Sequence, residues 1–133
     1  MNTKLLMTSS AIVLGITGLL LSFLPQEILE YAGASSVVLF PIFLQLLGAA
    51  YLGFAMLNWM AKGNLIGGIY SRPVAIGNLA HFVIGGLALL KSASTVPDGT
   101  AMWIAGAVYT IFAALFAVVT FTHPIKEVQT SKA

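Results

Sequence analysis

Residues 101–122 read AMWIAGAVYTIFAALFAVVTFT, an apolar run that contains no Asp, Glu, Lys or Arg. At about 1.5 Å per residue, a helix of this length crosses the roughly 30 Å hydrocarbon core of a bilayer. Residues 5–24, 36–61 and 73–91 are similarly apolar. The sequence therefore predicts an all-α integral membrane protein, a bundle of four transmembrane helices.

The composition leaves little room for a separate soluble domain, since 59% of the 133 residues are hydrophobic and only 8% are charged. We expect one transmembrane domain over residues 1–133. A β-barrel is excluded, because the apolar runs lack the alternation of period two that barrel strands show. A nucleic-acid partner is excluded too, because the six Lys and Arg residues form no clustered basic patch.

Metal and redox chemistry find few ligands in this sequence. The chain has no cysteine, which removes disulfides, thiol redox chemistry, iron–sulfur clusters and Cys-ligated zinc. Its two histidines, His81 and His123, lie in different helices near different depths, and the apolar runs contain no carboxylate. We therefore predict no catalytic residue, no metal and no cofactor, and we leave open whether the chain is an enzyme.

Charged residues separate the two ends of the predicted bundle. One side is basic and the other acidic: Lys4, Lys62, Arg72, Lys126 and Lys132 with Glu127, against Glu27, Glu30 and Asp98 with Lys91. Short loops rich in Lys and Arg stay in the cytoplasm. Both termini are therefore expected in the cytoplasm.

Small residues recur at helical spacing in three of the apolar runs. These stripes are Ala11, Gly15, Gly18 and Ser22; Gly77, His81 and Gly85; and Gly106, Thr110, Ala113 and Ala117. In lipid the hydrophobic effect does not join helices, so close backbone approach at small residues takes its place. We expect Gly18, Gly85 and Gly106 to face neighbouring helices.

Prolines mark the ends of the predicted helices. Pro25 ends the first helix, and residues 26–35 form a short amphiphilic connector, expected as a single interfacial turn. Pro41 allows two alternatives: the second helix begins near Phe40 with the proline in its first turn, or a longer helix from Ser36 kinks there.

Four polar residues of the second and third helices define a predicted polar seam: Tyr51, Asn58, Asn78 and His81. Tyr51 and Asn58 are seven residues apart and share a helix face, while Asn78 and His81 are three apart. Polar groups inside a membrane either bond neighbouring helices or mark a functional site. The sequence leaves both open, including for His81 a bond to Tyr51 or a backbone carbonyl, or a ligand contact.

Arg72 adds a charge beside this polar seam. It either follows the cytoplasmic bias of basic residues or holds an anionic headgroup or carboxylate beside the Gly67–Gly68 turn and the start of the third helix. The candidate ligand-binding residues are accordingly Tyr51, Asn58, Arg72, Asn78 and His81.

Residues 45–90 contain the motifs LGAAYLG (47–53), NW (58–59), RP (72–73) and GGL (85–87). In these motifs the chain resembles the DoxX-like group of small bacterial four-helix membrane proteins. The resemblance implies a bacterial inner-membrane protein, in some cases associated with quinone-linked oxidation. No functional residue is carried over from the group, and this chain has no redox group of its own.

Three classes of function fit these features. The first is a noncatalytic inner-membrane protein that binds a membrane lipid or another apolar small molecule between its helices, with Arg72, Asn78 and His81 fixing a polar head. The second is an accessory or structural subunit, whose glycine stripes dock a membrane-protein partner or a second copy. The third is a small transporter or channel.

Overall fold

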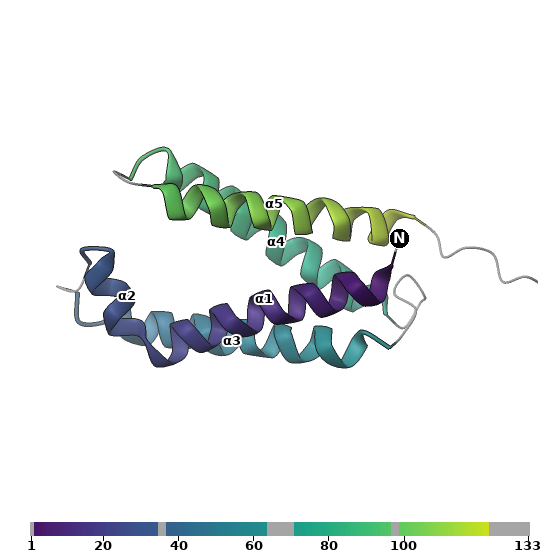
Figure 1. The fold of residues 1–133 in the computed structure, drawn as a ribbon, viewed down its shortest axis with the longest axis horizontal. Helices are drawn as coiled ribbons and strands as arrows, with labels where there is room; N and C mark the ends of the chain where they lie inside the picture. Colours follow the sequence, from purple (N-terminus) through teal and green to yellow (C-terminus); the bar gives the residue numbers. More distant parts are fainter. Residues whose placement is uncertain (1, 35–36, 64–70, 97–98, 123–133) are drawn as a thin grey trace, which may run out of the picture. The chain divides into compact units, whose positions relative to one another are not determined.

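The computed structural model describes residues 2–34, 37–63, 71–96 and 99–122. These residues form five helices and no strand: α1 (Thr3–Phe23), α2 (Pro25–Tyr31), α3 (Phe40–Ala61), α4 (Arg72–Ala93) and α5 (Thr100–Phe121) (Figure 1). All but α2 contain 21 or 22 residues and are long and apolar enough to cross a membrane. The expected all-helical fold with four such helices is confirmed.

The chain divides into two compact units, Met1–Gly63 with α1, α2 and α3, and Asn64–Ala133 with α4 and α5. The single domain over residues 1–133 stays a prediction.

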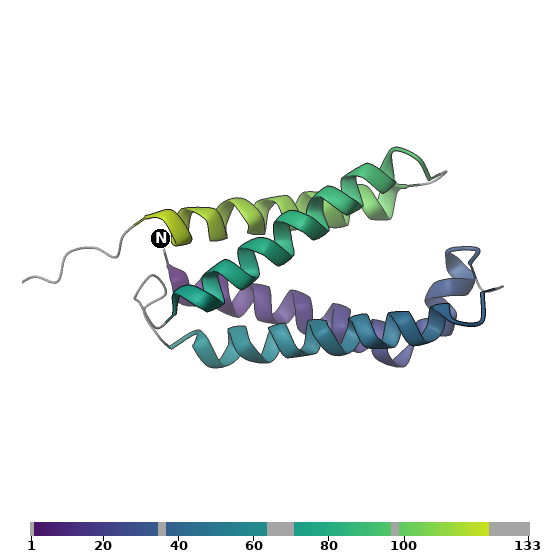
Figure 2. The same ribbon diagram turned by 180° about the vertical axis from the view of Figure 1, so that it is seen from behind.

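In the first unit α1 and α3 run antiparallel and pack along their length (Figures 1 and 2). Asn2 caps α1, since its Oδ1 accepts a hydrogen bond from the backbone N–H of Leu5 at 3.2 Å. The expected connector contains the seven-residue helix α2 in place of a single turn. Pro25 suits its first turn because proline has no N–H to leave unpaired, and α2 buries Leu29.

The start of α3 decides between the two alternatives at Pro41. The helix begins at Phe40, so the proline lies in its first turn. Residues 38 and 39 form a turn before it, and residue 36 lies outside the described residues. A proline within a longer helix would remove a backbone hydrogen bond, which lipid makes costly, and this explains the later start.

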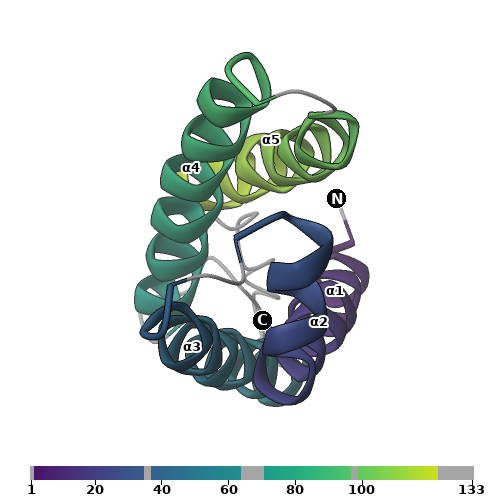
Figure 3. The same ribbon diagram turned by 90° about the vertical axis from the view of Figure 1, so that its left-hand side faces the viewer.

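In the second unit α4 and α5 form an antiparallel pair, seen from the side in Figure 2 and from one end in Figure 3. Phe82 of α4 is fully buried against aromatic rings of α5. Its ring centroid lies 4.9 Å from that of Phe112, 5.1 Å from that of Tyr109 and 5.7 Å from that of Phe116. These rings make the core of this pair.

Candidate functional site

Glycines bring the backbones of α1 and α3 into contact. A Cβ atom placed on Gly18 would lie 2.9 Å from the carbonyl oxygen of Gly48. A Cβ atom on Gly48 would lie 2.8 Å from the backbone nitrogen of Ser22 and 2.9 Å from the carbonyl oxygen of Gly18. Carbon atoms do not approach so closely, so only glycine fits at either position.

Two glycines of the second unit, Gly85 and Gly106, also face a neighbouring helix. A Cβ atom on Gly85 would lie 2.7 Å from the Tyr109 ring, and one on Gly106 would lie 2.7 Å from the Leu90 side chain. The prediction that Gly18, Gly85 and Gly106 face neighbouring helices is therefore confirmed. Gly48 was not among the predicted stripes, although it contacts the backbone of α1 at Gly18 and Ser22.

Asn58 joins α3 to α1. Its side chain is fully buried, and its Nδ2 donates a hydrogen bond to the Oγ of Ser10 at 3.0 Å. Ser10 is also fully buried, and its own hydroxyl donates to the carbonyl oxygen of Met7 at 3.0 Å. Sequence reasoning missed Ser10, because at 3.6 residues per turn it lies about 80° around α1 from Gly18, outside the predicted stripe. Asn58, one of the candidate ligand-binding residues, thus makes a hydrogen bond that joins α3 to α1.

The other members of the predicted site occupy varied environments. Tyr51 is half-buried on α3, whereas Asn78 is fully buried on α4 and its Nδ2 donates to the carbonyl oxygen of Val74 at 2.9 Å. His81 is half-buried, with its ring centroid 5.6 Å from that of Tyr109. The polar seam draws on both units, so it stays a prediction.

Arg72 is exposed at the first residue of α4. The Gly67–Gly68 turn expected beside it lies outside the described residues. The two readings of this arginine therefore both stay open.

A groove runs along the contact between α1 and α3, with a volume of about 340 Å³. Its residues come from both helices and are all apolar or aromatic; we call it the α1–α3 groove, lined by Ala11, Ile12, Gly15, Leu19, Leu52, Ala55, Met56 and Trp59. Small residues make room in it, because Ala11, Gly15 and Ala55 project little or no side chain. Larger exposed side chains such as Ile12 and Met56 border it.

A positive charge stands at one end of this groove. The Nζ of Lys62 lies 3.0 Å from the centroid of the Trp59 ring, in a cation–π contact. Lys62 as a whole is half-buried. The α1–α3 groove therefore has an apolar lining, and the Lys62 amine lies beside its Trp59 end.

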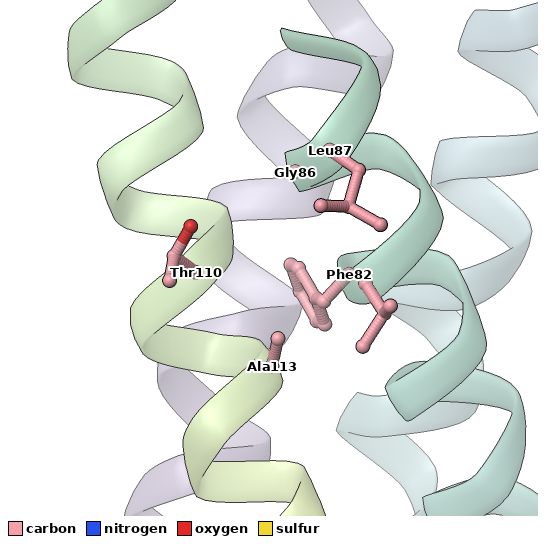
Figure 4. A pocket seen from close by; sticks show the side chains of 6 residues that line it. Phe82, Gly86, Leu87, Thr110 and Ala113 are labelled. Atoms are coloured by element: carbon pink, nitrogen blue, oxygen red, sulfur yellow. The ribbon is translucent and has the colours of Figure 1, made fainter. Parts of the chain in front are cut away.

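A smaller groove of about 170 Å³ lies between α4 and α5 (Figure 4). In Figure 4, Phe82, Gly86 and Leu87 of α4 face Thr110 and Ala113 of α5. The Thr110 hydroxyl donates to the carbonyl oxygen of Gly106 at 2.8 Å, so its hydrogen is already bonded within α5. This groove offers a bound molecule less room than the α1–α3 groove.

Within the part of the chain that the structure describes, no three His, Cys, Asp or Glu side chains gather into a group that could hold a metal ion.

No protein-family model, curated protein or solved structure matches the chain. The resemblance to DoxX-like proteins accordingly stays a prediction.

Proposed function

We propose that this chain is a noncatalytic membrane protein that binds an apolar or lipid-like molecule between α1 and α3. The observation that carries the proposal is the α1–α3 groove, with its volume of about 340 Å³ and its apolar lining. Pockets for small molecules span roughly 300–1,000 Å³ and are lined mostly by apolar and aromatic side chains, which is the character of this groove.

Four helices of the chain are long and apolar enough to cross a membrane. Inside a membrane, a concave apolar surface already contacts hydrocarbon and not water, so the hydrophobic effect does not drive a molecule into it. It gains dispersion contacts when a chain or ring of matching shape fills it, and an empty groove forfeits them. A floor of glycine and alanine between larger side chains therefore favours an elongated apolar occupant.

We place the protein in a bacterial inner membrane with both termini in the cytoplasm. The support for this orientation is the distribution of charge, because Lys4, Lys62 and Arg72 fall on the side that the short-loop rule assigns to the cytoplasm. In this orientation the Trp59 end of the groove is its cytoplasmic end.

Asn58 then has a supporting role, because its bond to Ser10 joins the two helices that form the groove. Tyr51, Arg72, Asn78 and His81 line neither described groove. A polar head fixed by Arg72, Asn78 and His81 is not part of this proposal.

Filling the groove tests the proposal. Gly15→Leu is suited to this, because a Cβ atom on Gly15 would lie 3.7 Å from the Cβ of Ala55, an ordinary contact that leaves the helices in place. The rest of the leucine side chain then occupies the groove that Gly15 lines. Gly53→Leu is the matched control, because a Cβ atom there meets nothing within 4 Å and Gly53 does not line the groove.

Native mass spectrometry of protein released from mild detergent reports any retained small molecule. We expect an apolar adduct on the unmodified chain and on Gly53→Leu, and its loss from Gly15→Leu. Equal adducts on all three proteins, or none on any of them, would overturn the proposal. If a second protein copurifies with the chain and no small molecule does, the accessory-subunit class is favoured.

A further inference from the structure

We propose that the occupant of the α1–α3 groove is an anionic phospholipid of the cytoplasmic leaflet, with an acyl chain in the groove and its phosphate on Lys62 and Lys4. This inference rests on the proposed function and adds the chemical class of the ligand. It is carried by the positions of the two lysines relative to the residues that line the groove.

Both helix faces that line the groove lead to a lysine at the same end. On α3 the lining residues Ala55 and Trp59 are followed, three residues after Trp59, by Lys62. On α1, steps of four residues lead from Ile12 back through Thr8 to Lys4. Side chains three or four residues apart lie on one face of a helix, so each lysine continues its own lining row.

The antiparallel packing of the helices brings these two rows to one end. Gly15 faces Ala55, Ser10 bonds Asn58, and the carboxyl end of α3 therefore lies beside the amino end of α1. Lys4 is exposed there, and the Thr8 hydroxyl donates to its carbonyl oxygen at 2.8 Å. Lys4 and Lys62 therefore both lie at the Trp59 end of the groove.

Trp59 supports the same reading. It lines the groove, and its ring holds the Lys62 amine 3.0 Å from the ring centroid. Tryptophan is enriched where hydrocarbon meets the headgroups, and an ammonium beside it is at the depth of lipid phosphates. An ammonium donates charge-assisted hydrogen bonds to phosphate oxygens, so the headgroup has a partner at this level.

The length of the groove fits a chain from that leaflet. From Trp59 to Leu52 the α3 row spans seven residues, or about 10 Å at 1.5 Å per residue. One leaflet contributes about 15 Å, half of a hydrocarbon core of about 30 Å. An acyl chain that enters at Trp59 therefore remains beside the lining residues for most of its leaflet.

Charge, more than the acyl chain, supplies the selectivity in this proposal. The hydrocarbon tails of all membrane lipids fill an apolar groove about equally well, so the groove alone selects shape and not lipid class. A basic residue near the surface of an anionic leaflet strengthens the binding of the protein to that leaflet about fivefold. Two lysines are accordingly expected to favour an anionic over a zwitterionic lipid by about 10- to 30-fold.

The test uses the full chain in bilayers of equimolar phosphatidylglycerol and phosphatidylcholine with identical acyl chains. After mild detergent extraction, native mass spectrometry counts the retained lipid of each class. The double variant Lys4→Gln/Lys62→Gln removes both charges while keeping similar side-chain length. Lys91→Gln is the control for general loss of charge, because Lys91 lies in the last turn of α4, in the other unit.

We expect phosphatidylglycerol to predominate on the unmodified chain and on Lys91→Gln, and the two lipids to be retained about equally on the double variant. A lipid adduct that Gly15→Leu removes but that shows no headgroup preference, or a preference that survives in the double variant, would overturn the inference and leave the proposed function standing. An adduct that Gly15→Leu does not reduce would overturn both.

Discussion

The contact between Gly48 and α1 gives a sharp prediction for Gly48→Ala. The added methyl group would lie 2.8 Å from the backbone nitrogen of Ser22 and 2.9 Å from the carbonyl oxygen of Gly18. These are backbone atoms of a helix, so no side chain can rotate out of the way and the two helices must move apart. Gly53→Ala makes the same chemical change on the same helix, but its methyl group meets nothing within 4 Å.

The difference between the two variants isolates the cost of the contact. Replacing glycine by alanine in a helix is worth about 1 kcal/mol in helix propensity, and this gain is common to both variants. Overpacking a close contact costs about 1–3 kcal/mol, and backbone atoms on the other side place Gly48→Ala in the upper half of that range. We therefore expect Gly48→Ala to be less stable than Gly53→Ala by about 2–3 kcal/mol.

Unfolding in mixed micelles with increasing dodecyl sulfate, followed by loss of helical circular dichroism, measures both free energies of unfolding. Gly53→Ala should unfold at or above the dodecyl sulfate fraction of the unmodified chain, and Gly48→Ala well below it. If the two variants unfold together, α1 and α3 do not approach at Gly48 and the reasoning fails.

Three further predictions follow from the contacts and the charge pattern. Ser10→Ala removes the acceptor of the Asn58 amide and should lower the free energy of unfolding by about 0.6 kcal/mol, and by no more than about 1.7 kcal/mol, whereas Ser9→Ala, whose hydroxyl bonds only its own helix among the described contacts, should change it less. Gly106→Leu should cost about 1–3 kcal/mol by forcing α4 and α5 apart, and an unchanged unfolding midpoint would show that this glycine does not face α4. With the carboxyl terminus in the cytoplasm, a reporter that functions only in the cytoplasm should be active when fused after Ala133, and a reporter that functions only in the periplasm should be inactive. The opposite result would refute the proposed orientation.

The helices themselves could be predicted because lipid leaves few alternatives. Backbone groups must be paired within each crossing segment, so an apolar run of sufficient length becomes a helix. Proline then limits where that helix starts, as at Pro41 in α3 and Pro73 in α4. The sequence left Phe40 and Ser36 open as starts of α3, because a proline both suits a first turn and kinks a longer helix.

The partner of Asn58 could not be chosen from the sequence. Thr8, Ser9 and Ser10 are consecutive hydroxyl residues in α1, and each donates to a carbonyl oxygen of its own helix. Of these three, Ser10 is the one that accepts the bond from Asn58, because it faces α3 when the two helices are paired. The α1–α3 groove could not be predicted for the same reason. Its lining residues come from two helices, and no local sequence pattern encodes how those helices align.

The alignment of α1 with α3 also determines how these two helices keep their register. A slide of α1 along α3 by one turn, about 5.4 Å, would part Asn58 from Ser10 and Gly48 from Gly18, so a polar bond and a backbone contact reject the same displacement. The chain has no cysteine, which makes the register directly readable by a single engineered pair. Cysteines at positions 15 and 55 would have Cβ atoms 3.7 Å apart, within the roughly 3.5–4.5 Å that a disulfide spans. Oxidation should therefore cross-link α1 to α3 at this pair and fail when either cysteine is moved by one turn.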